Sequence, residues 1–399
     1  MSDGERNLGP DGFEEVERAV WAARPHELAT VAGRALGRYT GGGDARVLLP
    51  DYRQTVLVSP DGDETPIANT APGRAFAAQR TVREGTDGVL HVPLTAQGDR
   101  IGVLTVPSAP GAPEPARLDE LAAVLARALR LADGGTDLYR RIRRRTRLTV
   151  AAEMQWDLLP ASAFETAEIG FAGRLEPAYA VWGDHFDWAA SADGFTMSVT
   201  NGMGSGTEAA ALTHLAVSAL RNARRSGGDI VEQATLADQC VYARYRGDLH
   251  VSTLLLDFDH ATGRVRTVDA GSPRIYRLRG TVADLVGFDA QLPLGMFGDT
   301  RYTIEEFAVE PGDRLVVVSD GVHAARSPST GEVFGGTRLL NALRDTRLQA
   351  APEAVGTVIR TYVDFYEGEE PSDDAVVVCV DWWGRAVGRR VGRGVSGGA

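Results

Sequence analysis

Residues 315–321 read LVVVSDG, a run of four apolar residues followed by serine, aspartate and glycine. Three consecutive valines favour a β-strand, which we place at Arg314–Ser319. Gly321 supplies the freedom that a tight turn needs directly after the strand. The stretch therefore predicts a strand whose end presents Asp320 at the edge of a sheet.

Two other stretches also place an aspartate beside glycine or a second aspartate, and one related stretch lies between them: VWGDHFD (181–187), NGMGSG (201–206) and SDDAV (372–376). Taken singly, Asp184 and Asp320 are better explained as turn residues, and Asp373–Asp374 could be a loop pair. Taken together, carboxylates from separate strand ends provide the oxygen ligands that a hard divalent cation requires. The second stretch carries Asn201 where the pattern calls for an aspartate.

The composition is that of a globular protein with a sizeable core. The chain has 399 residues, 43% of them hydrophobic and 24% charged, which suffices for two domains. Its formal net charge of -12 disfavours nonspecific binding of nucleic acid by the whole molecule. Only Cys240 and Cys379 are present, without the spacing of a zinc site or a disulfide scaffold.

The sequence also predicts the compartment. No apolar run approaches the about 20 residues of a membrane-spanning helix. The N-terminus, MSDGERNLGPDGFEE, is acidic and lacks the apolar segment of a signal peptide. We therefore expect a cytoplasmic protein with neither a membrane nor a nucleic acid as partner.

The N-terminal third reads as a small α+β domain over residues 13–133, after a disordered segment over 1–12. Helical periodicity covers 13–40 and returns over 117–132. Between them lie strand-like runs with Gly-Asp turns: Ala45–Leu49, Gln54–Ser59, Gly88–Pro93 and Ile101–Pro107. The paired strands VLHVPLTAQGDRIGVLTVPS (89–108) and the helix after them resemble a GAF domain. That resemblance implies a sensor domain with a small ligand, whose identity stays unknown.

A linker helix is predicted over residues 136–159, capped by Thr136 and ended by Pro160. One face is apolar, and the other carries a series of arginines between 140 and 147. An arginine-rich helix binds RNA or an anionic membrane in some proteins, but a solvated face is the simpler interpretation in an acidic chain. At a domain junction, the apolar stripe suggests a homodimer seam or a signal lever.

Residues 160–384 form the second predicted domain, followed by a disordered Gly/Arg-rich tail over 385–399. Nine strands and four outer helices fit the pattern, which favours two packed sheets covered by helices rather than alternating βαβ units. The helices are predicted at 206–225, 229–244, 336–346 and 352–366. The strands are predicted at Ile169–Leu175, Phe186–Ala190, Phe195–Thr200, Val251–Asp259, Arg264–Ala270, Arg274–Leu278, Tyr302–Val309, Arg314–Ser319 and Ala375–Asp381.

The order of motifs over 150–382 resembles the SpoIIE-type branch of the PPM metal-dependent Ser/Thr phosphatases. The matching segments are AAEMQWDLLP (151–160), EPAYAVWGDHFD (176–187), NGMGSGTEAA (201–210), STLLLDFDHATGRVRTVDAGSPRIYRLR (252–279), LPLGMF (292–297), EPGDRLVVVSDGVHAARSPSTGEVFG (310–335) and SDDAVVV (372–378). The resemblance implies an α+β fold with a C-terminal two-sheet β-sandwich flanked by helices, behind the GAF-like domain and linker helix.

The resemblance also implies the site. Asp184, Asp320 and Asp373 match the catalytic carboxylates of the family, and the metal ligands implied are Asp184, Asn201, Gly202, Asp320 and Asp373. In the family, the position of Asn201 bridges two Mn²⁺ or Mg²⁺ ions, and the following glycine carbonyl helps to hold them. Two such cations lower the pKa of a shared water and neutralise charge on the phosphoester.

This chain departs from the family pattern at several motif positions. Asn201 keeps one carbonyl oxygen but has no charge with which to bridge two cations, so the second metal site is weakened. Trp182 replaces a glycine, and Ser272 stands where the family has histidine. Asp187 is the nearest candidate for a replacement bridge, and His185 and His323 are expected at the border of the site.

Three functions follow as hypotheses. The first is an active phosphatase that dephosphorylates a phosphorylated STAS-type anti-anti-sigma protein in bacterial signalling, with the GAF-like domain as input. The second is a pseudophosphatase that binds this partner without turnover, because Asn201 has weakened catalysis. The third is a scaffold in which the sensor domain carries the function. Metal titration combined with phosphoester hydrolysis separates the first two.

Overall fold

The computed structural model describes residues 10–85, 88–107, 113–145, 147–176 and 182–385, and it divides into two compact units. The N-terminal unit spans Met1–Arg147 and the C-terminal unit Leu148–Ala399. In the described residues, no helix has both the length and the apolar character needed to cross a bilayer. The predicted disordered ends lie mostly outside the described residues, but Pro10 already starts helix α1, so the expected boundary at residue 12 is wrong.

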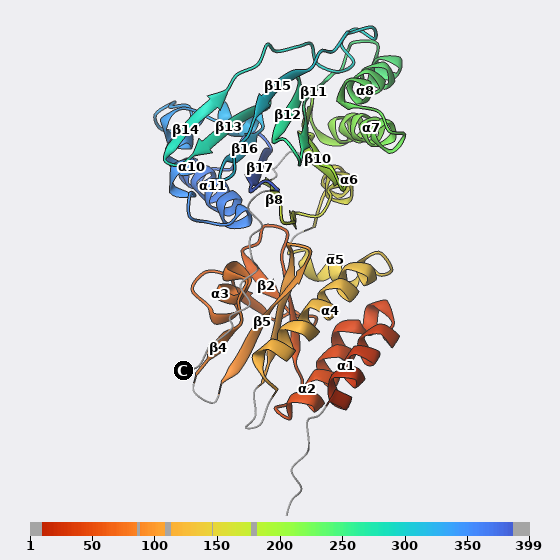
Figure 1. The fold of residues 1–399 in the computed structure, drawn as a ribbon, viewed down its shortest axis with the longest axis vertical. Coiled ribbons are helices and arrows are strands. Elements are labelled where there is room, and N and C mark those ends of the chain that lie inside the picture. Colours follow the sequence, from red (N-terminus) through yellow and green to blue (C-terminus); the bar gives the residue numbers. More distant parts are fainter. Residues whose placement is uncertain (1–9, 86–87, 108–112, 146, 177–181, 386–399) are drawn as a thin grey trace, which may run out of the picture. The chain divides into compact units, whose positions relative to one another are not determined.

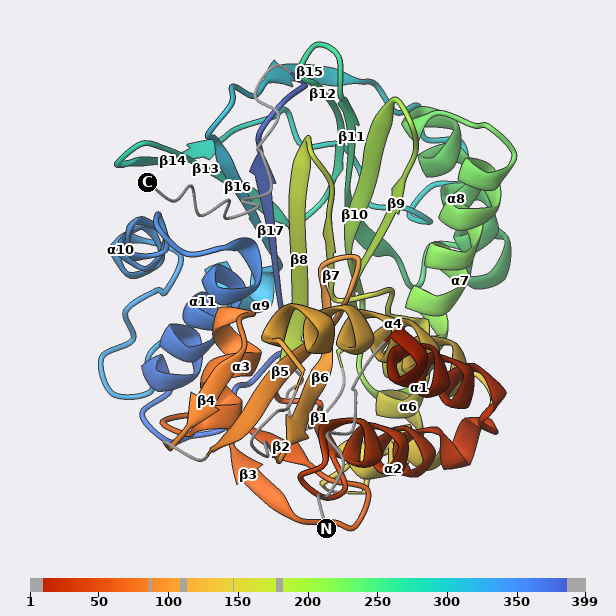
Figure 2. The same cartoon turned by 60° about the horizontal axis from the view of Figure 1, so that its bottom comes forward.

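The N-terminal unit, in red to yellow in Figure 1, is built on an antiparallel six-stranded sheet in the order β3-β2-β1-β6-β5-β4, whose strands are labelled in Figure 2. The paired segments 89–108 predicted from the sequence form its centre. The strands are β1 (Arg46–Pro50), β2 (Val56–Val58), β3 (Glu64–Pro66), β4 (Val82–Glu84), β5 (Val89–Ala96) and β6 (Asp99–Val106).

Helices cover both faces of this sheet. On one face α1 (Pro10–Ala22), α2 (Leu28–Thr40) and α4 (Pro115–Asp133) enclose the main core of the unit. On the other face α3 (Ala71–Ala78), which the sequence did not predict, packs Phe76 against β1, β2 and β6. The helix expected over 13–40 is two helices, since Pro25 opens a short 3-10 turn, Pro25–Glu27, between them.

The single linker helix predicted over 136–159 is wrong. The chain forms α5 (Leu138–Arg143) and α6 (Val150–Leu158), because Arg144 is extended and Thr149 caps α6 by accepting a hydrogen bond from Ala152 N. Ile142 packs on the core of the N-terminal unit, whereas Leu148 packs beside α6 in the C-terminal unit. The apolar residues of the expected dimer interface therefore belong to two different cores. A homodimer stays a prediction, and this helix no longer supports it.

The C-terminal unit contains two antiparallel sheets. The first has the order β15-β12-β11-β10-β9, and the second has the order β14-β13-β16-β17-β8-β7. The strands are β7 (Ala163–Glu165), β8 (Ile169–Glu176), β9 (Asp184–Ala190), β10 (Gly194–Gly202), β11 (Val251–Asp259), β12 (Arg264–Ala270), β13 (Arg274–Arg279), β14 (Val282–Val286), β15 (Glu305–Ala308), β16 (Arg314–Val318) and β17 (Ala375–Trp382).

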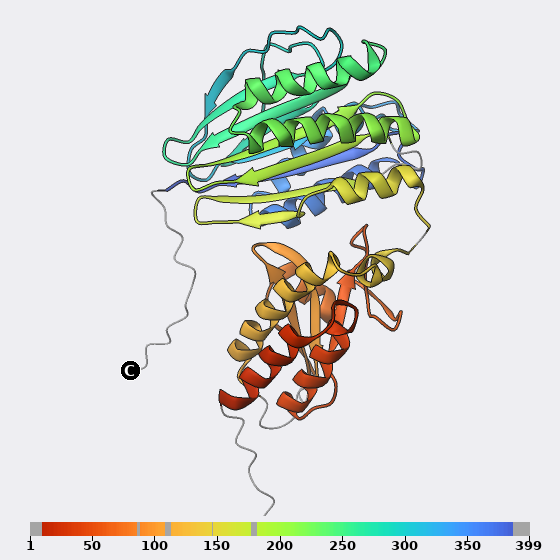
Figure 3. The ribbon, with the colours of Figure 1, turned by 90° about the vertical axis from the view of Figure 1, so that its right-hand side faces the viewer.

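The two sheets pack face to face around aromatic and branched side chains, among them Phe171, Phe195 and Val317. Helices α7 (Gly206–Arg225) and α8 (Ile230–Tyr245) cover the outer face of the first sheet, in green in Figures 2 and 3. Helices α10 (Thr337–Asp345) and α11 (Ala351–Phe365) cover the second sheet (Figure 2). This mixed arrangement of sheets and helices is the two-sheet core with outer helices that the sequence predicts.

Candidate metal centre

The first edge of the site comes from the paired strands β9 and β10. β9 begins at Asp184 and β10 ends at Gly202, so in this antiparallel pair both ends lie at the same edge. Asp184 and Asn201 are direct partners in the register, which places their side chains on the same face of the sheet.

Glycines make this edge compact. A Cβ at Gly202 would lie 2.3 Å from Thr213 Oγ1, and Gly183 has a φ of +90° that disfavours other residues. Thr213 Oγ1 donates to the carbonyl of Gly183 at 2.7 Å, which anchors the edge on α7. The glycines flanking Asp184 and following Asn201 are therefore required by close packing of the backbone.

The second edge comes from β16 and β17. Ser319 follows β16, and its Oγ accepts from Val376 N at 3.0 Å, so the end of β16 is held against the start of β17. The short helix α9 (Asp320–His323) begins here. A Cβ on Gly321 would lie 1.9 Å from the carbonyl oxygen of Asp374, so only glycine permits this approach. Asp320 is thereby placed beside the Asp373–Asp374 pair.

The two edges meet at a hydrogen bond between side chains. Asn201 Nδ2 donates to Asp320 Oδ1, joining β10 of the first sheet to α9 beyond the second. The predicted site residues Asp184, Asn201, Gly202, Asp320 and Asp373 are thus brought to one place by the fold.

Asp184 is the most unusual carboxylate of this centre. It is fully buried, and neither oxygen has a hydrogen-bond partner of normal geometry among the described residues. Burial raises its pKa well above the usual value, and the nearby charges of Asp374, Asp373 and Asp320 raise it further, against a smaller opposing effect of the Ser319 hydroxyl. A buried carboxylate without partners demands either a proton or a cation.

The second perturbed carboxylate is Asp373. Its pKa is raised to about 7 by burial and then by the charges of Asp320 and Asp374. Its Oδ1 accepts a hydrogen bond from the backbone N–H of Asp374 at 2.8 Å, which opposes this rise. The four acidic groups therefore repel one another, and a divalent cation among them would relieve that repulsion.

Asp374 and Gln155 contact each other and the backbone of the centre, which the sequence did not reveal. Asp374 is buried, and its Oδ2 accepts from Gln155 Nε2 and from Trp182 N, both at 2.8 Å. Gln155 Nε2 also donates to the carbonyl of Asp184 at 2.8 Å. Gln155 on α6 therefore positions both edges of the centre. The sequence feature that could have indicated Gln155 was its position at the start of the QWDLLP segment (155–160).

The chemistry of the donor set fits a cation, although the described residues hold no ready-made cluster of three carboxylate, imidazole or thiolate groups around one point. The hydrogen bond from the Asn201 amide occupies one oxygen of Asp320. An ionised carboxylate at position 201 could not form this bond, because it has no proton to donate. The unpartnered oxygens of Asp184 and the raised pKa values are the observations that support a hard divalent ion here.

Two expectations about neighbouring residues are wrong. Asp187 cannot supply a replacement bridge, because it lies three residues along β9 from Asp184 and faces the opposite side. Arg221 and Arg224 of α7 hold it at 2.8 and 2.9 Å and oppose the effect of burial, so its pKa is lowered. His185 is likewise buried on the α7 side, not at the border of the centre.

His323 does lie beside the centre, since it ends α9. Its Nε2 is 2.9 Å from the carbonyl of Ser272, so this nitrogen carries the proton and donates to that oxygen. Burial lowers the pKa of His323, although this hydrogen bond opposes the shift. His323 therefore ties the turn before β13 to the helix that carries Asp320.

The raised pKa values of Asp184 and Asp373 predict how the metal-free protein responds to pH. A carboxyl whose pKa is higher in the folded than in the unfolded state binds more protons when folded, so stability falls as the pH rises. In excess chelator, the free energy of unfolding should decrease from about pH 4 to pH 7 through these groups. Urea titrations of the wild type and Asp373→Asn check this, and an equal slope in both would contradict it.

Comparison with known proteins gives a family for part of the chain. Residues 191–383 match the family described as Stage II sporulation protein E (SpoIIE). This segment is a SpoIIE-family domain. It belongs to the PPM-type Ser/Thr phosphatases, as the motif order predicts. The match includes Asn201, Gly202, Asp320 and Asp373 and begins after Asp184.

Individual relatives are distant. Protein IcfG of Synechocystis is 31% identical over 87 residues, which span 22% of this chain and 13% of IcfG. The SiaA-PP2C domain of Pseudomonas aeruginosa has 22% identity and a TM-score of 0.48, covering 53% of this chain and 85% of that one. The SpoIIE phosphatase domain with a regulatory fragment from Bacillus subtilis has 18% identity and a TM-score of 0.48, covering 53% and 63%.

Proposed function

We propose that the chain is a metal-dependent protein Ser/Thr phosphatase whose cation centre is formed by Asp184, Asp320 and Asp373. The observation that carries this proposal is the convergence of Asp320, Asp373 and Asp374 on the buried, unpartnered oxygens of Asp184. Membership of residues 191–383 in the SpoIIE family supplies the reaction class.

In this proposal the ion is Mn²⁺ or Mg²⁺, since both prefer carboxylate and carbonyl oxygens. Asp184, Asp320 and Asp373 would hold it through carboxylate oxygens, and Asn201 and Gly202, on the strand that pairs with that of Asp184, are the carbonyl candidates. When bound, such ions generate a nucleophilic hydroxide and offset the charge of a phosphoester. Asp374 stays a positioning residue, because Gln155 and Trp182 already occupy one of its oxygens.

Asn201 limits the centre. Its amide donates to Asp320, so the residue that would bridge two cations instead connects the two sheets without any cation. We therefore infer one firmly held ion and a weak second one, and a slow enzyme. The same hydrogen bond favours the second candidate function, a pseudophosphatase that binds a phosphorylated partner without turnover.

The substrate we propose is a phosphorylated STAS-type regulatory protein in bacterial partner-switching signalling. The motif resemblance to SpoIIE-type phosphatases supports this choice. The N-terminal unit, with its GAF-like order of helices and strands, would then serve as the input domain.

The test is a phosphate-release assay with Mn²⁺ on a serine-phosphorylated STAS protein and on a small phosphoester. We expect release from the phosphoprotein that chelator abolishes and that Asp373→Asn reduces by about 100-fold or more, because a charged ligand is lost. Asp345→Asn, an exposed residue at the end of α10, is the matched control and should keep wild-type activity. Saturable binding of the phosphoprotein without release would instead establish the pseudophosphatase.

A further inference from the structure

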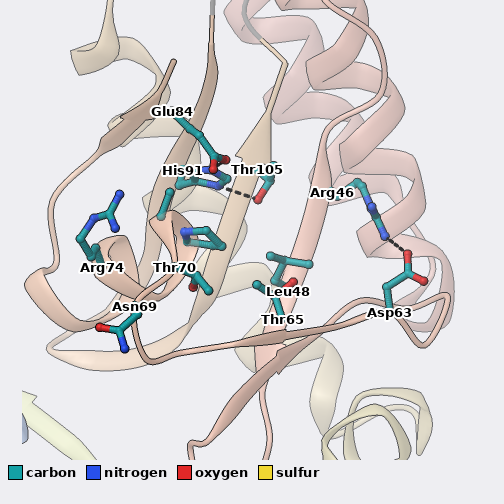
Figure 4. A pocket seen from close by; sticks show the side chains of 12 residues that line it. Arg46, Leu48, Asp63, Thr65, Asn69, Thr70, Arg74, Glu84, His91 and Thr105 are labelled. Carbon is teal, nitrogen blue, oxygen red and sulfur yellow. Dashed lines mark hydrogen bonds and ion pairs between the residues drawn. The ribbon is translucent and has the colours of Figure 1, made fainter.

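The N-terminal unit contains a cavity of about 460 Å³ on the α3 side of its sheet (Figure 4). This volume lies within the range of sites that hold small molecules. Its lining comes from β1, β3, β4, β5, β6 and the first turn of α3. The cavity therefore lies inside one unit, far in sequence from the metal centre.

The floor of the cavity is a row of polar side chains across three adjacent strands. Arg46 on β1 and His91 on β5 are both register partners of Thr105 on β6, so the three side chains share one face. The next row along the same face is apolar, with Leu48 opposite Val103, and packs under α3. The polar row of Arg46, Thr105 and His91 therefore lies just beyond the part of the sheet that α3 covers.

His91 is the most buried member of this row. Its side chain is only 4% exposed, and its two ring nitrogens contact Thr105 Oγ1 and Glu84 Oε2, each at 3.1 Å. A buried histidine held from both sides keeps one orientation, and the Thr105–His91–Glu84 chain is a preorganised set of hydrogen-bonding groups. Such a set suits the hydroxyl groups of a ligand, which both donate and accept.

The charges around the cavity are largely paired, with one exception. Arg46 forms an ion pair with Asp63, and Glu84 contacts His91. Arg74 on α3 lies across the cavity from Arg46 (Figure 4) and is exposed, and its guanidinium has no ion-pair or hydrogen-bond partner within the described part of the chain. An unpaired guanidinium beside a polar cavity favours a carboxylate or phosphate group.

We propose that this cavity binds a small hydroxylated organic anion, with its carboxylate or phosphate on Arg74 and its hydroxyl groups on the Thr105–His91–Glu84 chain. This proposal goes beyond the phosphatase function and does not depend on it. The cavity has room for a ligand of sugar-acid or sugar-phosphate size.

The test is calorimetric titration of the full chain with three probes of similar size. Gluconate carries a carboxylate, glucose 6-phosphate a phosphate, and sorbitol neither, so the three separate the two anion sources from hydroxyl binding alone. We expect one of the anions to bind at least about tenfold more tightly than sorbitol.

Variants place the binding in the cavity. Arg74→Gln should weaken anion binding about tenfold or more, and Thr105→Val should also weaken it by removing a hydroxyl from the row. Arg34→Gln is the matched control, since Arg34 is an exposed arginine of α2 on the other face of the sheet. Binding unchanged by Arg74→Gln, equal binding of sorbitol, or no binding of either anion at about 10 mM would overturn the proposal.

Discussion

The Asn201→Asp variant is expected to bind a second divalent cation and to hydrolyse phosphoesters at least about 100-fold faster than the wild type. In the wild type, the Asn201 amide donates to Asp320 and occupies one oxygen of that carboxylate. A carboxylate at position 201 would face both Asp184 and Asp320 as a third negative group. A cation between these carboxylates relieves their repulsion, so affinity for the second ion should rise.

The same substitution should make the metal-free protein less stable. Loss of the hydrogen bond and repulsion from Asp320 both act in the absence of ions. Thermal unfolding in chelator and in Mn²⁺ measures the stability of the two states. The difference between the two melting temperatures should be larger for the variant than for the wild type. Asn222→Asp, at an exposed position of α7, makes the same charge change away from the centre and serves as control. A folded Asn201→Asp variant with no extra metal and no change in rate would refute this explanation of Asn201.

The Asp320→Asn variant is expected to lose metal-dependent stabilisation. An ion at a concentration of 100 times its Kd stabilises the folded state by about 2.7 kcal/mol, or about 5–10 °C in the melting temperature of a domain of this size. Asparagine conserves the shape of Asp320 but removes the charge that the ion requires. Differential scanning calorimetry with and without Mn²⁺ measures the difference.

The control for this second experiment is again Asp345→Asn, which removes one negative charge from an exposed position of α10. It should retain the full stabilisation by Mn²⁺. If Asp320→Asn were stabilised as much as the control, Asp320 would not be a ligand, and the centre would have to be assigned to other residues.

The strands of the C-terminal unit were predictable because their signal is local. The valines of 316–318 and the alternating pattern of 264–270 lie within the strands that they specify, and β16 and β12 cover these residues. Helix α8 is similarly local, since Asp229 and Glu232 form a capping box at its start. Such features need no knowledge of distant residues.

The features that the sequence did not reveal depend on tertiary contacts. Gln155 and Asp374 are 219 positions apart, and only the folded sheets bring them together. Helix α3 is short, and the close contact of Gly73 with the backbone of Ile67 positions it against the sheet. The break at Arg144 likewise follows from α5 and α6 packing on different units.

The placement of Asp187 and His185 was predictable but was missed. Residues one and three positions from Asp184 on a strand face away from it, so the period of two already separates them from the centre. Arg221 and Arg224 are three positions apart and share one face of a helix. This pair of cations could have indicated an ion-pair partner for Asp187 away from the centre.

The central claim is that Asp184, Asp320 and Asp373 form a cation centre that Asn201 restricts to one firmly held ion. Equilibrium titration with Mn²⁺, followed by the paramagnetic resonance signal of the free ion, counts the bound ions directly. We predict one tightly bound ion in the wild type, two in Asn201→Asp, and none in Asp184→Asn. No tight Mn²⁺ or Mg²⁺ in the wild type, or an unchanged count in Asp184→Asn, would contradict this account of the site.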